Sequence, residues 1–140
     1  MELKVVYGCG DVDWSAASEI LQATGMASHA FEKHRRAFEA SHTTVFIYSE
    51  NQLIGFGRAI SDGEYQAAIY DVAVAPQFQG HGIGSLIMEK ILEQLPDCNV
   101  ILYAAPGKEG FYQKHKFRKM KTGMALFLNS AAKAMRGFSE

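Results

Sequence analysis

The stretch from Ile69 to Leu95 most constrains what this chain can fold into, because it reads as an apolar strand, a glycine-rich turn and a helix in immediate succession. The turn occupies residues 79–85, QGHGIGS. The first N–H groups of a helix have no partner within the helix, and the helix dipole places positive charge at the same end. The turn is therefore predicted to be an anion site, and phosphate is its natural ligand.

The spacing of Gly80, Gly82 and Gly84 sets aside two common phosphate-binding turns. The pattern G-x-G-x-G lacks the G-x-G-x-x-G register of a dinucleotide-binding turn, and no Gly-Lys-Ser/Thr follows, as a P-loop requires. Glycines at such a junction can also serve tight packing alone. The phosphate interpretation therefore depends on the surrounding sequence.

Hydrophobic periodicity predicts the elements on either side of this turn. A first helix is expected to begin at a cap formed by Asp11 or Asp13 and to end near Thr24-Gly25. A second, amphipathic helix is expected at 31–40, with His34 among its polar, solvated residues. We expect strands at 3–7, 43–49, 53–60, 65–74, 100–104, 117–120 and 124–128, the fifth of them buried, and further helices at 83–95 and 111–115.

This order predicts an α/β (α+β) fold, with a mixed, mostly antiparallel sheet of six to seven strands and helices on both faces. With 140 residues, the chain is expected to form one domain, 1–140. The net charge of −1 gives no overall field toward nucleic acid or a membrane surface, so a small-molecule partner fits better. Cys9 and Cys98 lack the spacing of a disulfide framework or zinc site; we expect no metal, no signal peptide or membrane span, and a reducing cytoplasm.

Two motifs, in the expected order, carry a resemblance to a known family. The run Gln79 to Gly84, Q-x-x-G-x-G after V-A-V-A-P, resembles the acyl-CoA-binding signature of the GNAT N-acetyltransferase superfamily. The later run GFYQKHKF, residues 110–117, is similar to the F-Y-x-x-x-G-F segment of that family, although Lys116 stands where glycine is usual. The pair looks most like small bacterial and chloroplast acetyltransferases, which include serotonin-type arylalkylamine N-acetyltransferases.

The resemblance implies a GNAT fold and an N-acetyltransferase that uses acetyl-CoA as co-substrate and acetylates a primary amine of a small molecule, or of a peptide or protein. It implies that the strand before the turn binds the pantetheine arm through its backbone and that Tyr112 both contacts the cofactor and protonates the departing thiolate. A non-catalytic acyl-CoA sensor is the alternative, which the retained tyrosine disfavours. The implied cofactor-binding residues are Val72, Ala73, Val74, Gln79, Gly80, His81, Gly82, Ile83, Gly84, Ser85 and Tyr112.

Asp71 is a carboxylate within the apolar run AAIYDVAVA, where burial is costly unless the group is paired or hydrogen-bonded. Strand alternation places it on one face with Ile69 and Ala73. Two interpretations stay open, a catalytic or amine-binding role and a structural, hydrogen-bonded carboxylate. The weaker candidates for a proton acceptor are His29, His34, His42, Glu64 and Tyr70. A homodimer is also compatible with the sequence.

Overall fold

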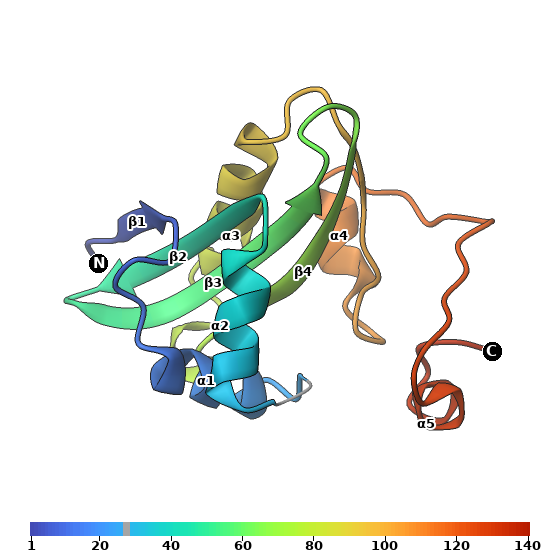
Figure 1. Ribbon diagram of the computed structural model, residues 1–140, viewed down its shortest axis with the longest axis horizontal. Helices are drawn as coiled ribbons and strands as arrows, with labels where there is room; N and C mark the ends of the chain where they lie inside the picture. The colour runs from blue at the N-terminus through green and yellow to red at the C-terminus, as the bar shows by residue number, and fades with distance from the viewer. Residues whose placement is uncertain (27–28) are drawn as a thin grey trace. The chain divides into compact units, whose positions relative to one another are not determined.

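The computed structural model describes residues 1–26 and 29–140 (Figure 1). The described chain falls into two compact units, Met1–Leu102 and Tyr103–Glu140. Each unit is described by itself below, and the expectation of one domain stays a prediction.

The first unit is built on a five-stranded sheet in which the strands lie in sequence order. Neighbouring strands are antiparallel from β1 to β4, and β5 joins β4 in parallel. β2 and β3 are joined by a two-residue turn at Glu50 and Asn51, and both residues have positive φ, as a type I′ hairpin turn requires. The strands are β1 (Lys4–Tyr7), β2 (Thr43–Ser49), β3 (Gln52–Ser61), β4 (Gln66–Val74) and β5 (Asn99–Ile101).

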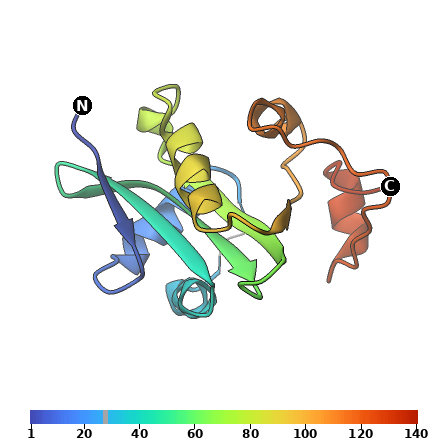
Figure 2. The same ribbon diagram turned by 90° about the horizontal axis from the view of Figure 1, so that it is seen from above.

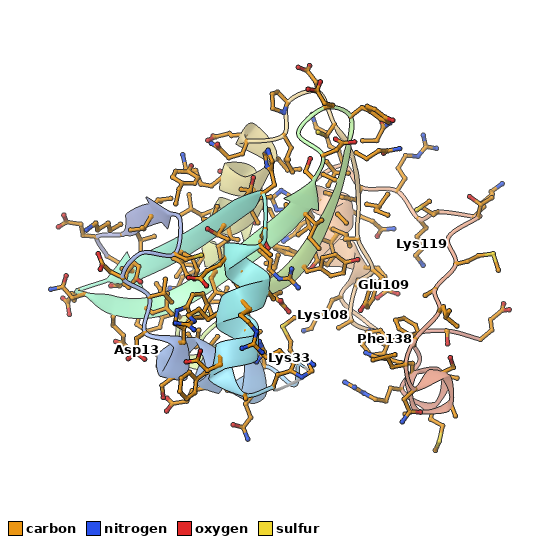
Figure 3. All side chains as sticks on the ribbon, in the orientation of Figure 1. Asp13, Lys33, Lys108, Glu109, Lys119 and Phe138 are labelled. Carbon is orange, nitrogen blue, oxygen red and sulfur yellow. The ribbon has the colours of Figure 1, made fainter. Side chains whose placement is uncertain are left out.

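Helices cover both faces of this sheet, as Figure 2 shows: α1 (Trp14–Ala23) and α2 (Phe31–Glu39) on one face, α3 (Ile83–Glu93) on the other. Of the two expected caps, Asp13 begins α1, because its carboxylate accepts a hydrogen bond from the Ala16 N–H at 3.1 Å (Figure 3). An aromatic cluster anchors the α1 and α2 side of the core. Its rings, 5.5–6.1 Å apart, belong to Trp14, Phe38, Phe46 and Phe56.

The opposite face depends on two glycines in β3, which let α3 lie close to the strand. A Cβ atom at Gly57 would stand 2.9 Å from Ile91 Cδ1 and 3.0 Å from Ile87 Cγ2. At Gly55 a Cβ would come within 3.1 Å of Ile87 Cδ1. The apolar side of α3 is fully buried there. A side chain at either position would therefore clash with α3, and the close packing fixes where α3 lies along the sheet.

The close packing of α3 makes a stability prediction. Gly57→Ala should lower the free energy of unfolding by about 1–3 kcal/mol, because the added methyl group overpacks a well-filled interface. The matched control is Gly10→Ala, where a Cβ would meet no atom within 4 Å and φ is not positive. Denaturant unfolding of the two variants measures the difference, and equal midpoints would contradict the close approach.

The second unit holds two short helices, α4 (Glu109–Lys114) and α5 (Ser130–Met135), and no strand among its described residues. The strands expected at 117–120 and 124–128 are therefore wrong for this chain as described, and α5 was not expected. Alternating apolar residues suit a strand only where a partner strand and a covering surface exist. Met124, Leu126 and Leu128 have neither, since all three are more than 95% exposed.

The prediction of a buried strand at 100–104 is also wrong in its bounds and its burial. β5 ends at Ile101, and both Asn99 and Ile101 are exposed. It lies at the edge of the sheet, where one side of the strand has no neighbour within the described five strands. The mixed, mostly antiparallel α/β architecture with helices on both faces is confirmed, with five strands in place of six to seven.

Candidate functional site

A bulge interrupts β4 where the sequence places Asp71. Phe56 of β3 pairs with Ala73 and Arg58 pairs with Tyr70, so two residues of β4 face one of β3. Asp71 has a φ of 58°, in the left-handed region that aspartate tolerates better than most residues. The bulge reverses the alternation beyond it. The expected shared face of Ile69 and Ala73 is therefore wrong, because Ala73 packs with the α1 and α2 core while Ile69 lies on the other face.

β4 loses its parallel neighbour before the bulge. β5 pairs with β4 only at Gln66–Ala68, yet β4 continues to Val74. Within the described sheet, the later part of this β4 edge has no strand beside it. Val72, Ala73 and Val74, the residues expected to bind a pantetheine arm, lie in this open part. An extended ligand could therefore hydrogen-bond there as an added strand does.

The glycine turn follows directly after this open edge. A short 3-10 turn, Pro76–Phe78, leaves the strand, and the Gln79 side-chain amide donates a 3.0 Å hydrogen bond to the Val74 carbonyl. Gln79 thus ties the turn to the end of β4. Gly80 and Gly82 have φ of 81° and 79°, and a Cβ on either would meet no protein atom within 4 Å.

Gly82 is the N-cap of α3, and no side chain caps the helix. The first intrahelical bond runs from the Leu86 N–H to the Gly82 carbonyl at 3.0 Å. The N–H groups of Ile83 and Gly84 therefore lie in the first turn, where a helix has no internal acceptor to offer them. His81 is exposed and Ser85 is half-buried. The turn has the donors and the dipole of an anion site.

Asp71 is held by an arginine that the sequence analysis did not single out. Arg58 Nε lies 2.8 Å from Asp71 Oδ2, and the two side chains are 15% and 25% exposed. The guanidinium also lies over the rings of Phe38 and Tyr70, with Cζ 5.6 and 5.3 Å from their centroids. A planar cation suits both contacts. The one signal for Arg58 in the sequence is that it is the sole charge in the apolar run 53–60.

His34 is the second correction at this site. It was expected on the solvated side of α2, but the structure buries it to 4% exposure. Its Nε2 accepts a hydrogen bond from the His29 N–H at 3.1 Å, which requires the neutral ring. The pKa of His34 is lowered, and burial is the largest cause. The negative charge of Asp71 raises this pKa in part, and the positive charges of His29 and Arg58 lower it further.

The lowered pKa of His34 predicts a pH dependence of stability. Below the unfolded value near 6.5 the unfolded chain binds a proton that the folded chain does not, so the free energy of unfolding falls as the pH falls from 6.5 toward the folded pKa. His34→Gln, which retains an acceptor for the His29 N–H, should reduce this slope by up to about 1.4 kcal/mol per pH unit. Urea titrations from pH 7.5 to below 6 measure the slope, and an unchanged slope would contradict the assignment.

Tyr112 belongs to the second unit, on α4. Its ring contacts Phe111 and Phe117, with centroids 5.0 and 6.1 Å apart. The Tyr112 carbonyl accepts hydrogen bonds from the N–H groups of His115 and Phe117, which ends the helix. Lys116, which stands where the family has glycine, adopts a φ of 72° in that turn. Burial raises the pKa of Tyr112, so its hydroxyl stays protonated through the physiological range.

The structure thus brings together, in one unit, the open edge at Val72–Val74, the turn at 79–85, and Asp71 with Arg58. The roles assigned to these residues and to Tyr112 stay predictions. No group of three or more metal-ligating side chains lies among residues 1–26 and 29–140. The part of the chain that the structure describes also contains no helix long and apolar enough to cross a membrane.

Known proteins are similar to this chain in sequence and in fold. Residues 12–117 match the model of the acetyltransferase (GNAT) family. The chain is 29% identical to the uncharacterized N-acetyltransferase ycf52 of Porphyra purpurea over 133 residues, 89% of this chain and 76% of that protein. It is 34% identical to serotonin N-acetyltransferase 2, chloroplastic, of Oryza sativa subsp. japonica over 109 residues, 73% of this chain but only 54% of that protein.

Among solved structures, a protein of Staphylococcus aureus described as a probable acetyltransferase is 28% identical, with a TM-score of 0.80 over 90% of this chain and 99% of that one. A GNAT family protein of Streptococcus pneumoniae, 22% identical, shares the fold with a TM-score of 0.77 over 90% of this chain and 98% of that one. The family match covers most of the chain and spans both sequence motifs. The chain belongs to the GNAT acetyltransferase family.

Proposed function

We propose that this protein is an acetyl-CoA-dependent N-acetyltransferase that acetylates a primary amine of a small molecule. One observation carries the proposal. The unpaired edge of β4 leads directly into the N-terminus of α3, which begins at Gly82 without a side-chain cap, and Gln79 ties the connecting turn to the end of β4. Free Cys9 and Cys98 fit a reducing compartment, and we place the protein in the cytoplasm. The rice relative is named for serotonin, so arylalkylamines are the first amines to test.

The residues of the first unit fit acetyl-CoA. Positive φ at Gly80 and Gly82, with no protein atom where their Cβ would stand, leaves room for a phosphate against the backbone. The main chain of Val72–Val74 has an open edge for an extended amide-containing arm. Bound acetyl-CoA would supply an acetyl group activated as a thioester. The chain's own task is to hold this donor and to manage protons.

The amine must lose its proton before it can attack. For a Lys-like amine with a pKa of about 10.4, this costs on the order of 4 kcal/mol at neutral pH. Asp71 directly precedes the open edge in the chain, but its Oδ2 already accepts a charge-assisted hydrogen bond from Arg58. This pairing favours a structural or amine-binding role for Asp71 over that of a free base. Positioning of the two substrates would then supply a larger share of the rate.

The test of activity is the release of free CoA thiol from acetyl-CoA in the presence of an amine panel. We expect amine-dependent release, with the acetylated amine identified by mass spectrometry. Binding of acetyl-CoA without release for any amine would instead support the acyl-CoA sensor. Failure to bind acetyl-CoA at all would remove the proposal.

Gly82→Ala tests the phosphate turn. The methyl group would project into the space that a phosphate needs, so the affinity for acetyl-CoA should fall about tenfold or more. The left-handed φ also costs about 1–2 kcal/mol of stability in any non-glycine residue. Calorimetry on the folded variant measures the affinity.

Gly25→Ala is the matched control for this variant. Gly25 has a φ of 74°, and its Cβ would also meet no atom within 4 Å, but it follows α1 instead of the turn. It should lose similar stability and keep the parent affinity for acetyl-CoA. Equal affinities of both variants would contradict the phosphate assignment.

Tyr112→Phe tests the general acid. The change removes the hydroxyl and retains the ring contacts, so kcat should drop on the order of 10²-fold while the acetyl-CoA affinity stays the same. The raised pKa keeps the Tyr112 phenol protonated, and the parent kcat should therefore show no loss of this acid up to about pH 10. A variant as fast as the parent across that pH range would mean that Tyr112 only packs.

A further inference from the structure

The protein fixes Arg58 through contacts that come from β4 and from the C-terminal end of α2. Its Nε donates to Asp71 Oδ2 at 2.8 Å, and its Nη1 lies 3.4 Å from Ser41 Oγ. The guanidinium also lies over the rings of Phe38 and Tyr70. Tyr70 and Asp71 belong to β4, whereas Phe38 belongs to α2 and Ser41 follows this helix. A planar, rigid cation suits such a set of contacts, so the fold itself sets the place of the guanidinium beside the bulge.

Asp71 needs a partner that directs its carboxylate. Aspartate side chains are short and readily bind backbone N–H groups of their own turn, as Asp62 does with the N–H groups of residues 64–66. Asp71 makes no such bond among residues 1–26 and 29–140, where Oδ2 binds Arg58 and Oδ1 has no hydrogen-bond partner. The side chain is 25% exposed. Arg58 therefore holds the carboxylate with one oxygen occupied and the other open.

The chain places this carboxylate at the start of the open edge. Asp71 is followed directly by Val72–Val74, the main chain proposed to bind the acyl donor. An alkylamine acceptor arrives at neutral pH as an ammonium ion, because a Lys-like pKa is about 10.4. An ammonium group has three donors and no acceptor. A carboxylate oxygen that is held in advance is its natural partner, since this side chain need not be ordered when the amine binds.

We propose that Arg58 is a positioning residue for the acceptor amine and acts through Asp71. It holds Oδ2, so that Oδ1 stays in place to accept a hydrogen bond from the ammonium group. The inference rests on the proposed function and makes it narrower, because the acceptors are then amines that bind as ammonium ions. Loss of Arg58 should therefore weaken the binding of the amine and leave the binding of acetyl-CoA unchanged.

Arg58→Met and Arg58→Gln form a matched pair. Glutamine carries its amide nitrogen on Cδ, as arginine carries Nε, so it still has a donor for Oδ2, whereas methionine has none. Steady-state kinetics should show the KM for the amine raised about tenfold or more in Arg58→Met and raised less in Arg58→Gln. The kcat and the KM for acetyl-CoA should stay within about twofold of the parent. An amine KM that is equal in the two variants would overturn the proposal.

Arg35→Met is the control for the loss of an arginine from this region. Arg35 lies on α2, and its ion pairs with Glu32 and Glu39 are exposed. This variant should keep the kinetic constants of the parent, because exposed ion pairs contribute little. An amine KM raised as in Arg58→Met would mean that any loss of positive charge near α2 has this effect, and would overturn the assignment to Arg58.

Asp71→Gly separates positioning of the amine from support of the bulge. Glycine adopts a φ of 58° without strain, so this variant keeps the bulge and loses the carboxylate. It should raise the amine KM as Arg58→Met does, and the double variant should raise it no further. Parent kinetics in Asp71→Gly would show that the pair only supports the bulge. Effects that multiply in the double variant would show that Arg58 acts without Asp71, and either result overturns the proposal.

The last measurement uses the alcohol with the carbon skeleton of the best amine, as a competitive inhibitor against that amine. The alcohol has no ammonium group, so its inhibition constant should be the same in the parent and in Arg58→Met. Equal weakening of alcohol and amine would show a distorted site and overturn the proposal. If the parent releases no thiol with any amine, the proposed function fails and this inference with it. If the parent acetylates amines and the amine KM is unchanged in Arg58→Met, the inference alone fails.

Discussion

The bulge at Asp71 is the constraint on which the candidate site depends. It adds one residue to β4 and lies within the stretch after Ala68, where β5 no longer pairs with β4. A left-handed φ outside glycine is costly, and Arg58 holds the strained residue from the adjacent strand through a 2.8 Å ion pair. The rings of Phe38 and Tyr70 also contact the guanidinium and help to fix its position. The bulge in the open part of β4 is thus held by side chains of the neighbouring strand and of α2.

A second constraint fixes the helix that follows. Gly55 and Gly57 let Ile87 and Ile91 lie against the β3 backbone, so α3 has little freedom to slide. The first turn of α3 is thereby held at the end of β4, where Gln79 ties the connecting turn to the strand. Backbone donors are useful for binding only when they are placed in advance. Both sets of glycines therefore help to place the N–H groups at the start of α3. Those of β3 do so by letting α3 pack closely, and those of the turn by adopting positive φ.

Local patterns in the sequence predicted most of the first unit. The β-branched and aromatic runs of β2 and β3, the periodicity of α3 and the cap at Asp13 each depend on neighbours in sequence, and the strands, the helix and the cap are all present in the structure. The predictions that were wrong depend on partners far away in the sequence. The burial of His34 needs the surface that α2 meets, the bulge needs the register against β3, and the strand expected at 124–128 needs a neighbouring strand. Period-two apolarity predicts the readiness to form a strand, not the presence of a partner.

The pairing of Asp71 with Arg58 also bears on how an amine would be handled. Oδ2 of Asp71 already accepts a charge-assisted hydrogen bond from Arg58 Nε, at 2.8 Å. The same carboxylate keeps lone pairs that Arg58 does not use and is a quarter exposed, so it could still accept a hydrogen bond from an ammonium group. Recognition of the charged amine and removal of its proton are then separate tasks. Asp71 suits the recognition of the ammonium group, and water or another group close to the bound amine would accept the proton.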